Sequence, residues 1–171
     1  NPISNAGAAY VLKKDNGSWT IVQKLIASDR TASAYFGEDV AINGNTIIIG
    51  SGGFNSEAGS AYVFELRNNK WTEVKKLLPS DILAGDRFGG AVDVFGDYIV
   101  VTADGQNLDE NGANDQPEAG AAYIYRRIGN EWWQTQKVVP VDRWTQNRFG
   151  NAVAISENHL IVGNSIWGSA G

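Results

Sequence analysis

Residues 58–89 read AGSAYVFELRNNKWTEVKKLLPSDILAGDRFG, and the chain contains this pattern three times. The other copies occupy residues 6–37 and 119–150, where nearly every apolar position matches. Four landmarks recur at identical offsets of 52 and then 61 residues: Tyr10, Tyr62 and Tyr123; Trp19, Trp71 and Trp132; Asp29, Asp81 and Asp142; and the Phe-Gly pairs that begin at Phe36, Phe88 and Phe149. Such regular recurrence indicates three copies of one structural unit.

Each unit is predicted to form four short antiparallel strands. Apolar residues alternate with a period of two, and each alternating run ends at a turn signal. In the middle of the chain these runs are SAYVFEL (60–66), WTEVKKL (71–77), FGGAVDVF (88–95) and DYIVVTA (97–103). Asn68-Asn69 separates the first two runs, and such dipeptides tolerate the positive φ angles of two-residue hairpins. The predicted fold class is therefore all-β, and no helix is expected.

A four-stranded meander that repeats at about 50 residues is typical of a β-propeller blade. The units resemble the FG-GAP repeat, the blade of the integrin alpha-subunit head and of many bacterial and fungal surface proteins. The resemblance rests on the Phe-Gly pairs, on the short-turn apolar strands after them, and on Ala-Gly-x-Ala-Tyr at residues 6–10, 58–62 and 119–123. It covers essentially the whole chain and implies a propeller used for adhesion, sugar binding or scaffolding.

We interpret residues 1–171 as one propeller segment with repeat units at 1–57, 58–118 and 119–171. The segment starts with the third and fourth strands of one blade, contains two complete blades and stops after the first two strands of another. These three blade equivalents form an arc, because propeller rings close with about four to eight blades. The expected partners are the remaining blades of a longer chain, or a second copy that completes a six-bladed ring.

Composition excludes several classes of partner and site. The chain has 14 Lys and Arg residues against 19 Asp and Glu residues, a net charge of -5, so we expect no nucleic-acid binding. No apolar run reaches the roughly 18 residues of a spanning helix, so we expect no membrane insertion. Cysteine is absent, which excludes disulfides and thiolate metal sites. With the family resemblance, these features favour an extracellular or cell-surface location.

The second unit is longer than the first because of an insertion at its end, between the second and third strands of a blade, and this insertion carries a calcium-loop pattern. The run NLDENGANDQPE begins at Asn107 and places oxygen ligands at alternate positions, with a glycine at the sixth. Such spacing curls ligands around one ion, and Ca²⁺ takes about six to eight oxygens. The predicted calcium ligands are Asn107, Asp109, Asn111, the Ala113 carbonyl, Asp115 and Glu118.

The same composition is also typical of a solvated loop, because Asp, Asn and Gly populate turns. Two departures separate residues 104–118 from the calcium loop of integrin-type blades. Position one is Asn107 instead of aspartate, and the loop follows the second strand of its blade, where the integrin loop follows the first. A calcium site and a solvated loop are therefore alternatives at this stage.

The residues that recur once per unit are predicted to be structural. We expect Asp29, Asp81 and Asp142 to accept backbone N–H bonds and so tie the crossover between blades. We expect Trp19, Trp71 and Trp132 to pack between blades.

Aromatic residues that do not recur are better candidates for recognition, because a flat aromatic face suits a sugar ring. Trp133, Trp144 and Trp167 belong to the third unit alone and are the predicted ligand contacts, and Tyr35 and Phe54 are similar residues elsewhere. The alternative for each is packing against a neighbouring blade.

No catalytic motif is recognisable, and the single histidine, His159, has no predicted partner. We therefore expect no enzyme. The predicted function is an extracellular or cell-surface module for adhesion or binding, with a lectin-like or protein ligand and a stabilising calcium ion. The alternative is a non-catalytic structural propeller attached to an enzyme or to a larger surface assembly.

Overall fold

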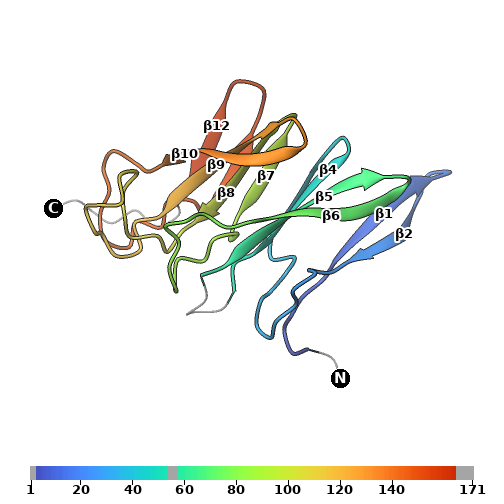
Figure 1. The fold of residues 1–171 in the computed structure, drawn as a ribbon, viewed down its shortest axis with the longest axis horizontal. Coiled ribbons are helices and arrows are strands. Elements are labelled where there is room, and N and C mark those ends of the chain that lie inside the picture. The colour runs from blue at the N-terminus through green and yellow to red at the C-terminus, as the bar shows by residue number, and fades with distance from the viewer. Residues whose placement is uncertain (1–2, 54–57, 165–171) are drawn as a thin grey trace.

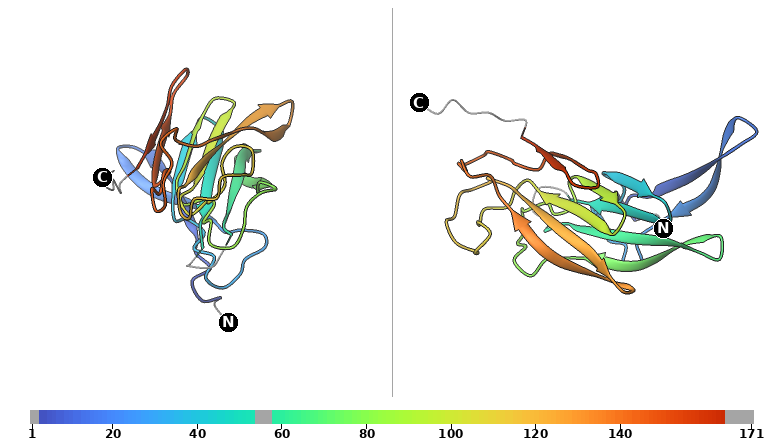
Figure 2. Two further views of the ribbon diagram at one scale, coloured as in Figure 1. Left: turned by 90° about the vertical axis from the view of Figure 1, so that its left-hand side faces the viewer. Right: turned by 90° about the horizontal axis from the view of Figure 1, so that it is seen from above.

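The chain forms an arc of antiparallel sheets, which confirms the all-β prediction. The structure, a computed structural model, describes residues 3–53 and 58–164. Two four-stranded sheets stand side by side between two hairpins at opposite ends of the arc (Figures 1 and 2). The leading hairpin contains β1 (Ala9–Asp15) and β2 (Ser18–Leu25), and the trailing hairpin contains β11 (Ala152–Ile155) and β12 (Leu160–Gly163).

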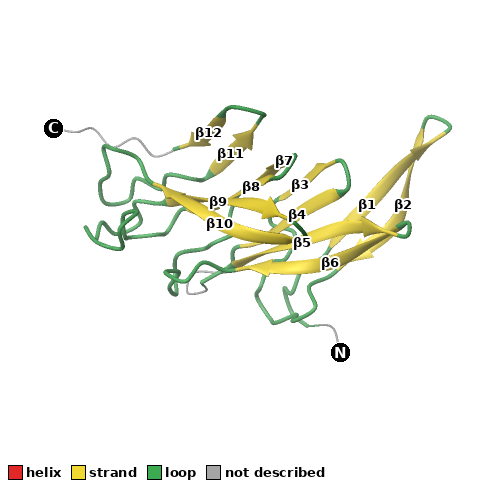
Figure 3. Cartoon of the chain, turned by 45° about the horizontal axis from the view of Figure 1, so that its top comes forward, coloured by secondary structure: helices red, strands yellow, loops and turns green. Residues whose placement is uncertain are grey.

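Each four-stranded sheet is one complete blade with its strands in sequential order. The first blade contains β3 (Val40–Asn43), β4 (Thr46–Ser51), β5 (Ser60–Arg67) and β6 (Lys70–Leu77). The second blade contains β7 (Val92–Phe95), β8 (Tyr98–Ala103), β9 (Ala121–Ile128) and β10 (Glu131–Val138). The described residues contain no helix, and hence none that is long and apolar enough to cross a bilayer (Figure 3).

Short turns with positive φ close the hairpins, as the sequence predicts. The φ angles are 47° at Asn16 and 86° at Gly17 in the leading hairpin, and 50° at Asn68 and 61° at Asn69 in the first blade. Asparagine and glycine enter this left-handed region at small steric cost, and the resulting turns match the twist of the strands that they join.

The first strand of each blade is shorter than predicted, because the Phe-Gly pair does not extend it. The strands β3, β7 and β11 begin only at Val40, Val92 and Ala152. In the first blade Gly37 has a φ of 94°, and the Glu38 N–H closes a tight turn onto the Tyr35 carbonyl at 3.0 Å. A left-handed glycine interrupts the extended backbone that a strand needs.

The Phe-Gly pair instead joins successive blades. The Phe88 N–H lies just before the second blade and donates to the Ala58 carbonyl, just before β5, at 2.9 Å. The same bond recurs at 3.2 Å and 3.0 Å in the other units, between Phe36 and Ala6 and between Phe149 and Ala119. The glycine that follows each alanine pairs with the same phenylalanine in a parallel bridge. The Ala-Gly and Phe-Gly motifs are therefore the two sides of one joint between blades.

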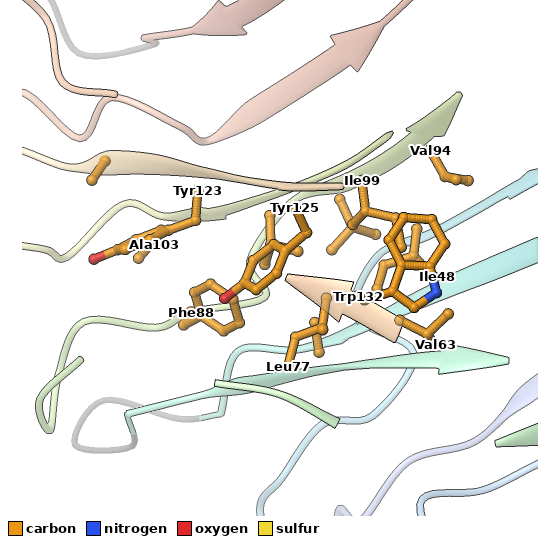
Figure 4. Packing of buried hydrophobic residues seen from close by; sticks show 14 residues of the cluster. Ile48, Val63, Leu77, Phe88, Val94, Ile99, Ala103, Tyr123, Tyr125 and Trp132 are labelled. Carbon is orange, nitrogen blue, oxygen red and sulfur yellow. The ribbon is translucent and has the colours of Figure 1, made fainter. Parts of the chain in front are cut away.

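The apolar core lies between blades. The larger cluster brings Ile48, Val63 and Leu77 of the first blade against residues of the second blade (Figure 4). Phe88 is fully buried in this cluster, and its ring meets the edge of Tyr123 at a centroid distance of 5.4 Å. Edge-to-face aromatic pairs add to the stabilisation from buried area. Each blade is therefore stabilised mainly by its neighbours.

Two of the recurring tryptophans confirm the predicted packing between blades. Trp71 is 9% exposed and packs with Leu25 of the leading hairpin, and Trp132 is 3% exposed and packs with Leu77 of the first blade. Trp19, in the leading hairpin, is 65% exposed. The two buried tryptophans thus pack toward the preceding part of the arc, and Trp19 is exposed because no blade precedes the leading hairpin among the described residues.

Candidate functional site

The insertion loop (residues 104–118) lies between β8 and β9, against the crossover (residues 139–151) that follows β10 (Figure 1). Arg143 of the crossover donates to the Asn107 carbonyl through Nη2 at 2.5 Å and to the Asn114 carbonyl through Nη1 at 3.0 Å. These charge-assisted hydrogen bonds fasten the loop to the crossover.

Asp109 anchors the loop from inside and is only 5% exposed. Its Oδ1 accepts the backbone N–H of Asn111 at 2.8 Å and of Ala113 at 2.9 Å, and its Oδ2 accepts the side-chain amide of Asn114. The Ala113 N–H above all, and then that of Asn111, lowers the pKa of the Asp109 carboxyl, because these bonds favour the ionised form. The carboxylate therefore organises the turn around itself.

Other predicted calcium ligands also accept bonds from the protein. Asn107 Oδ1 accepts the Glu118 N–H at 2.9 Å, and the Ala113 carbonyl accepts the Asp109 N–H at 2.9 Å. The Glu118 carboxylate forms an ion pair with Arg148 at 2.7 Å. The structure therefore places these oxygens in one loop, where they stabilise its backbone.

The remaining predicted ligands, Asn111 and Asp115, are exposed. Across residues 3–53 and 58–164, no three Asp, Glu, His or Cys side chains form a group that could hold a metal ion. The cations that meet the loop include the guanidinium groups of Arg143 and Arg148, and the sequence analysis missed both.

Gln106 connects the base of the insertion loop to the joint between blades. Its side chain is 1% exposed, and Nε2 donates to the Asp86 carboxylate at 2.9 Å and to the Tyr123 hydroxyl at 3.0 Å. Its Oε1 accepts the Leu108 N–H at 2.8 Å. Burial raises the pKa of both the Asp86 carboxyl and the Tyr123 hydroxyl. A satisfied buried network of this kind fixes the loop rigidly on the blade.

An open groove of about 610 Å³ lies between the insertion loop and the end of β10. The loop wall contains the polar side chains of Glu110, Asn114 and Gln116, and the facing wall contains the apolar residues Val138, Val139, Pro140 and Val141. The rest of the lining comes from Asp109, Gln136, Lys137 and Arg143. The groove therefore offers hydrogen-bonding groups on one side and an apolar surface on the other.

The predicted tryptophan contacts do not line this groove. Trp133 is 57% exposed near the start of β10, and Trp144 is half-buried in the crossover beyond the other end of that strand. At the rise of an extended strand, the stretch from Trp133 to Val138 alone spans roughly 16 Å. Trp167 and Phe54 lie outside the described residues. Trp133 and Trp144 are therefore separate surface features.

Two of the three recurring aspartates, Asp29 and Asp81, tie successive parts of the arc together, with side-chain partners in place of the expected backbone N–H groups. Asp29, which follows the leading hairpin, accepts bonds from the Tyr62 hydroxyl at 2.7 Å and from Lys76 Nζ at 2.6 Å, both in the first blade. The next joint repeats this arrangement at 3.4 Å and 2.7 Å, with Asp81, Tyr123 and Lys137. We call this triad the Asp-Tyr-Lys latch.

The latch has a clear electrostatic basis. The bond from Lys76, and then that from Tyr62, lowers the pKa of the Asp29 carboxyl. Burial in turn raises the pKa of the Tyr62 hydroxyl, which keeps it a donor. A latch therefore pairs an ionised aspartate with two donors from the following blade. Asp142, the third aspartate, is exposed and has no such partners among the described residues.

The comparisons with known proteins agree with this architecture. The family model described as the FG-GAP repeat matches residues 19–64, 71–125 and 132–170, which is most of the chain. A search of curated proteins found no match. Each matched stretch begins at a recurring tryptophan and includes one Phe-Gly joint. The chain therefore belongs to the FG-GAP repeat family and forms an arc of that family's propeller blades.

Proposed function

We propose that this chain is the ligand-binding part of an extracellular or cell-surface propeller, and that it binds without catalysis. One observation carries the proposal: one wall of the 610 Å³ groove is formed by the insertion that interrupts the repeat. Residues that recur in every unit serve the blade fold, whereas a loop on a rigid scaffold is the usual carrier of binding specificity. The buried Gln106 and the Arg143 bonds supply that rigidity.

The chemistry of the groove favours a carbohydrate. A sugar ring has hydroxyl groups at its edge and an apolar C–H surface on its faces. The carboxylate of Glu110 and the amides of Asn114 and Gln116 suit the hydroxyls, and the wall from Val138 to Val141 suits the ring face. A peptide segment of a protein ligand is the second candidate for the same groove.

The test is binding of the labelled chain to a glycan array, followed by titration of the retained glycan. We expect Glu110→Ala to weaken binding about tenfold or more, because a hydrogen bond to a charged group is worth roughly 1.5–3 kcal/mol. The matched control is Glu157→Ala, on the exposed turn of the trailing hairpin and outside the groove. Equal affinities of the two variants, or retention of protein ligands alone, would reject the carbohydrate proposal.

We also propose that Ca²⁺ binds the insertion loop, by exchanging the hydrogen bonds of Asp109 and its neighbours for ion contacts. With a dissociation constant of roughly 10⁻⁴–10⁻³ M, a hundredfold excess of Ca²⁺ should add about 2.7 kcal/mol to the free energy of unfolding. Mg²⁺ should substitute poorly, because it prefers six rigid ligands at shorter distances.

Thermal unfolding in calcium, magnesium and chelator measures this effect, with Asp109→Ala as the variant. Its control is Asp15→Ala, an exposed aspartate at the tip of the leading hairpin. Melting temperatures that are the same in all three solutions would leave the solvated loop as the correct interpretation.

The structural alternative is a non-catalytic propeller attached to an enzyme or to a larger surface assembly. The Asp-Tyr-Lys latches are compatible with it, because each of them ties two successive parts of the arc together. A catalytic domain elsewhere in the parent gene, with no ligand retained on glycan or protein arrays, would favour this alternative.

A further inference from the structure

The insertion loop carries five carboxylates and no lysine or arginine. The structure divides these carboxylates into two sets, because protein groups already engage three of them. Asp104 forms an ion pair with Arg87 at 2.9 Å, and Glu118 forms one with Arg148 at 2.7 Å. Asp109 is buried and accepts hydrogen bonds from three groups of the loop itself. These three carboxylates therefore hold the loop in place.

The other two carboxylates, Glu110 and Asp115, have no ion pair among the described residues. Both side chains are exposed. Glu110 lines the 610 Å³ groove, and Asp115 stands in the chain between Asn114 and Gln116, which line the groove as well. Glu110 accepts one long hydrogen bond, at 3.5 Å, from the side-chain amide of Asn111. The polar wall of the groove thus presents two carboxylates that can meet a ligand.

The two cations in the groove lining do not offset these charges. Lys137 forms an ion pair with Asp81 at 2.7 Å, and its side chain is only 6% exposed. Arg143 donates to two carbonyls of the insertion loop, and the carboxylate of Asp109 in the same lining has the opposite charge. The polar wall therefore carries unpaired negative charge, which attracts cations and repels anions.

The facing wall of the groove has a different chemistry. Residues 138–141 are apolar, and Val141 is fully exposed. A ligand that fits both walls needs a cationic group beside an apolar surface. A pyranose ring with an amine in place of one hydroxyl meets both needs, because its ammonium group supplies three donors and its face supplies C–H groups.

We infer that the groove selects a cationic amino sugar, whose ammonium group pairs with Glu110 while the face of its ring lies on residues 138–141. Asp115 adds to the negative potential at this wall. The inference rests on the proposed carbohydrate function and specifies the charge of the ligand. Hydrogen bonds between an ammonium group and a carboxylate are roughly twice as strong as those between neutral groups.

The same charges select against related sugars. An N-acetylated sugar has the same ring but no positive charge, so it gains only neutral hydrogen bonds at Glu110. An acidic sugar brings a second carboxylate to a wall that already has two, and is repelled. The groove therefore distinguishes sugars of similar shape by their charge.

Isothermal titration calorimetry of the full chain tests the inference with two oligosaccharides of equal length. One is a β-1,4-linked oligomer of glucosamine, and the other is the N-acetylated form of the same oligomer. The solution contains chelator, and its pH is mildly acidic, so that the sugar amines are protonated while Asp and Glu are ionised. We expect the glucosamine oligomer to bind about fivefold or more tightly than the N-acetylated one.

The salt concentration provides a second measurement of the same preference. Between about 0.01 M and about 1 M salt the Debye length falls from about 30 Å to about 3 Å. Affinity for the glucosamine oligomer should therefore fall steeply, whereas affinity for the uncharged N-acetylated oligomer should stay nearly constant.

The variant E110Q isolates the charge, because it keeps the shape of the side chain and its capacity for hydrogen bonds. It should lower the affinity for the glucosamine oligomer nearly to that for the N-acetylated one, and leave the latter almost unchanged. D115N should reduce the preference by a smaller factor. The control E157Q makes the same change of net charge on the exposed turn of the trailing hairpin, and it should preserve the preference. Glu110 is not among the predicted calcium ligands, so this test is separate from that of calcium.

The outcomes distinguish this inference from the proposed function. Equal or tighter binding of the N-acetylated oligomer would overturn the inference and leave the carbohydrate proposal standing. A preference that E110Q does not reduce would also overturn it. Failure of the glucosamine oligomer to bind would do the same, and if the glycan array retained no glycan either, the carbohydrate proposal would fall with it. Binding of oligolysine in place of both sugars would mean that the groove takes a basic peptide.

Discussion

Gly59→Ala is expected to lower the free energy of unfolding by about 3 kcal/mol or more. Gly59 has a φ of 79°, and a Cβ built on it would lie 2.1 Å from the Phe88 carbonyl oxygen. The backbone there has little freedom to withdraw, because the Phe88 N–H is bonded to the Ala58 carbonyl. The variant must therefore either strain its backbone or open the joint. Urea denaturation followed by circular dichroism measures the loss.

Gly44→Ala is the matched control for this experiment. Gly44 has a φ of 57° in the turn between β3 and β4, and nothing lies within 4 Å of a Cβ built there. Gly44→Ala should therefore lower the free energy of unfolding by only about 1–2 kcal/mol, the cost of placing an alanine in the left-handed region. If both variants lose the same stability at equal protein concentration, the close approach of the two motifs does not hold the blades together.

Phe88→Ala is expected to cost about 3–5 kcal/mol, the range for removing a large aromatic side chain from a packed core. The ring is fully buried and lies 5.4 Å from Tyr123 and 6.3 Å from Tyr125, measured between ring centres. Its removal leaves a cavity between the two complete blades. The surrounding residues lie on β strands, so they can move inward only partly to fill it. Denaturant unfolding of the variant reports the cost directly.

Phe95→Ala tests whether this cost comes from burial. Phe95 lies at the end of β7 and is 38% exposed, so much of its surface is already in water. Its loss should cost roughly 1 kcal/mol. If Phe88→Ala and Phe95→Ala lower the free energy of unfolding by similar amounts, the cluster between the blades does not dominate stability.

The sequence predicts most of the fold because every strand is present in several copies. A single apolar run such as TIIIGS is ambiguous, but its alignment with YIVVTA identifies both as the second strand of a blade. The first strands were predicted too long, because Phe36 and Gly37 continue the apolar pattern. The left-handed φ of Gly37 and the bond from Phe36 to Ala6 are contacts across the chain that no local pattern contains.

The candidate site was less predictable for the opposite reason, since the insertion loop occurs once. Its spacing of Asp and Asn indicated a cage for an ion, yet the same residues also form turns around Asp109. Which of the two a loop adopts depends on donors outside it, such as Arg143, which lies 36 residues beyond Asn107. The partners of the recurring aspartates were missed in the same way, because Tyr62 and Lys76 belong to the following blade.

The division of each latch between two successive units bears on how such a chain changes its length. The second unit shows this division. It contributes Asp81 to the latch with the third unit, and it contributes Tyr62 and Lys76 to the latch with the first unit. Duplication or deletion of a whole unit in the gene therefore leaves the number of acceptors equal to the number of donors. A rearrangement that adds or removes only part of a unit separates them and leaves a charge unmatched. Selection would thus retain gains and losses of whole blades, and a ring could grow or shrink without redesign of its joints.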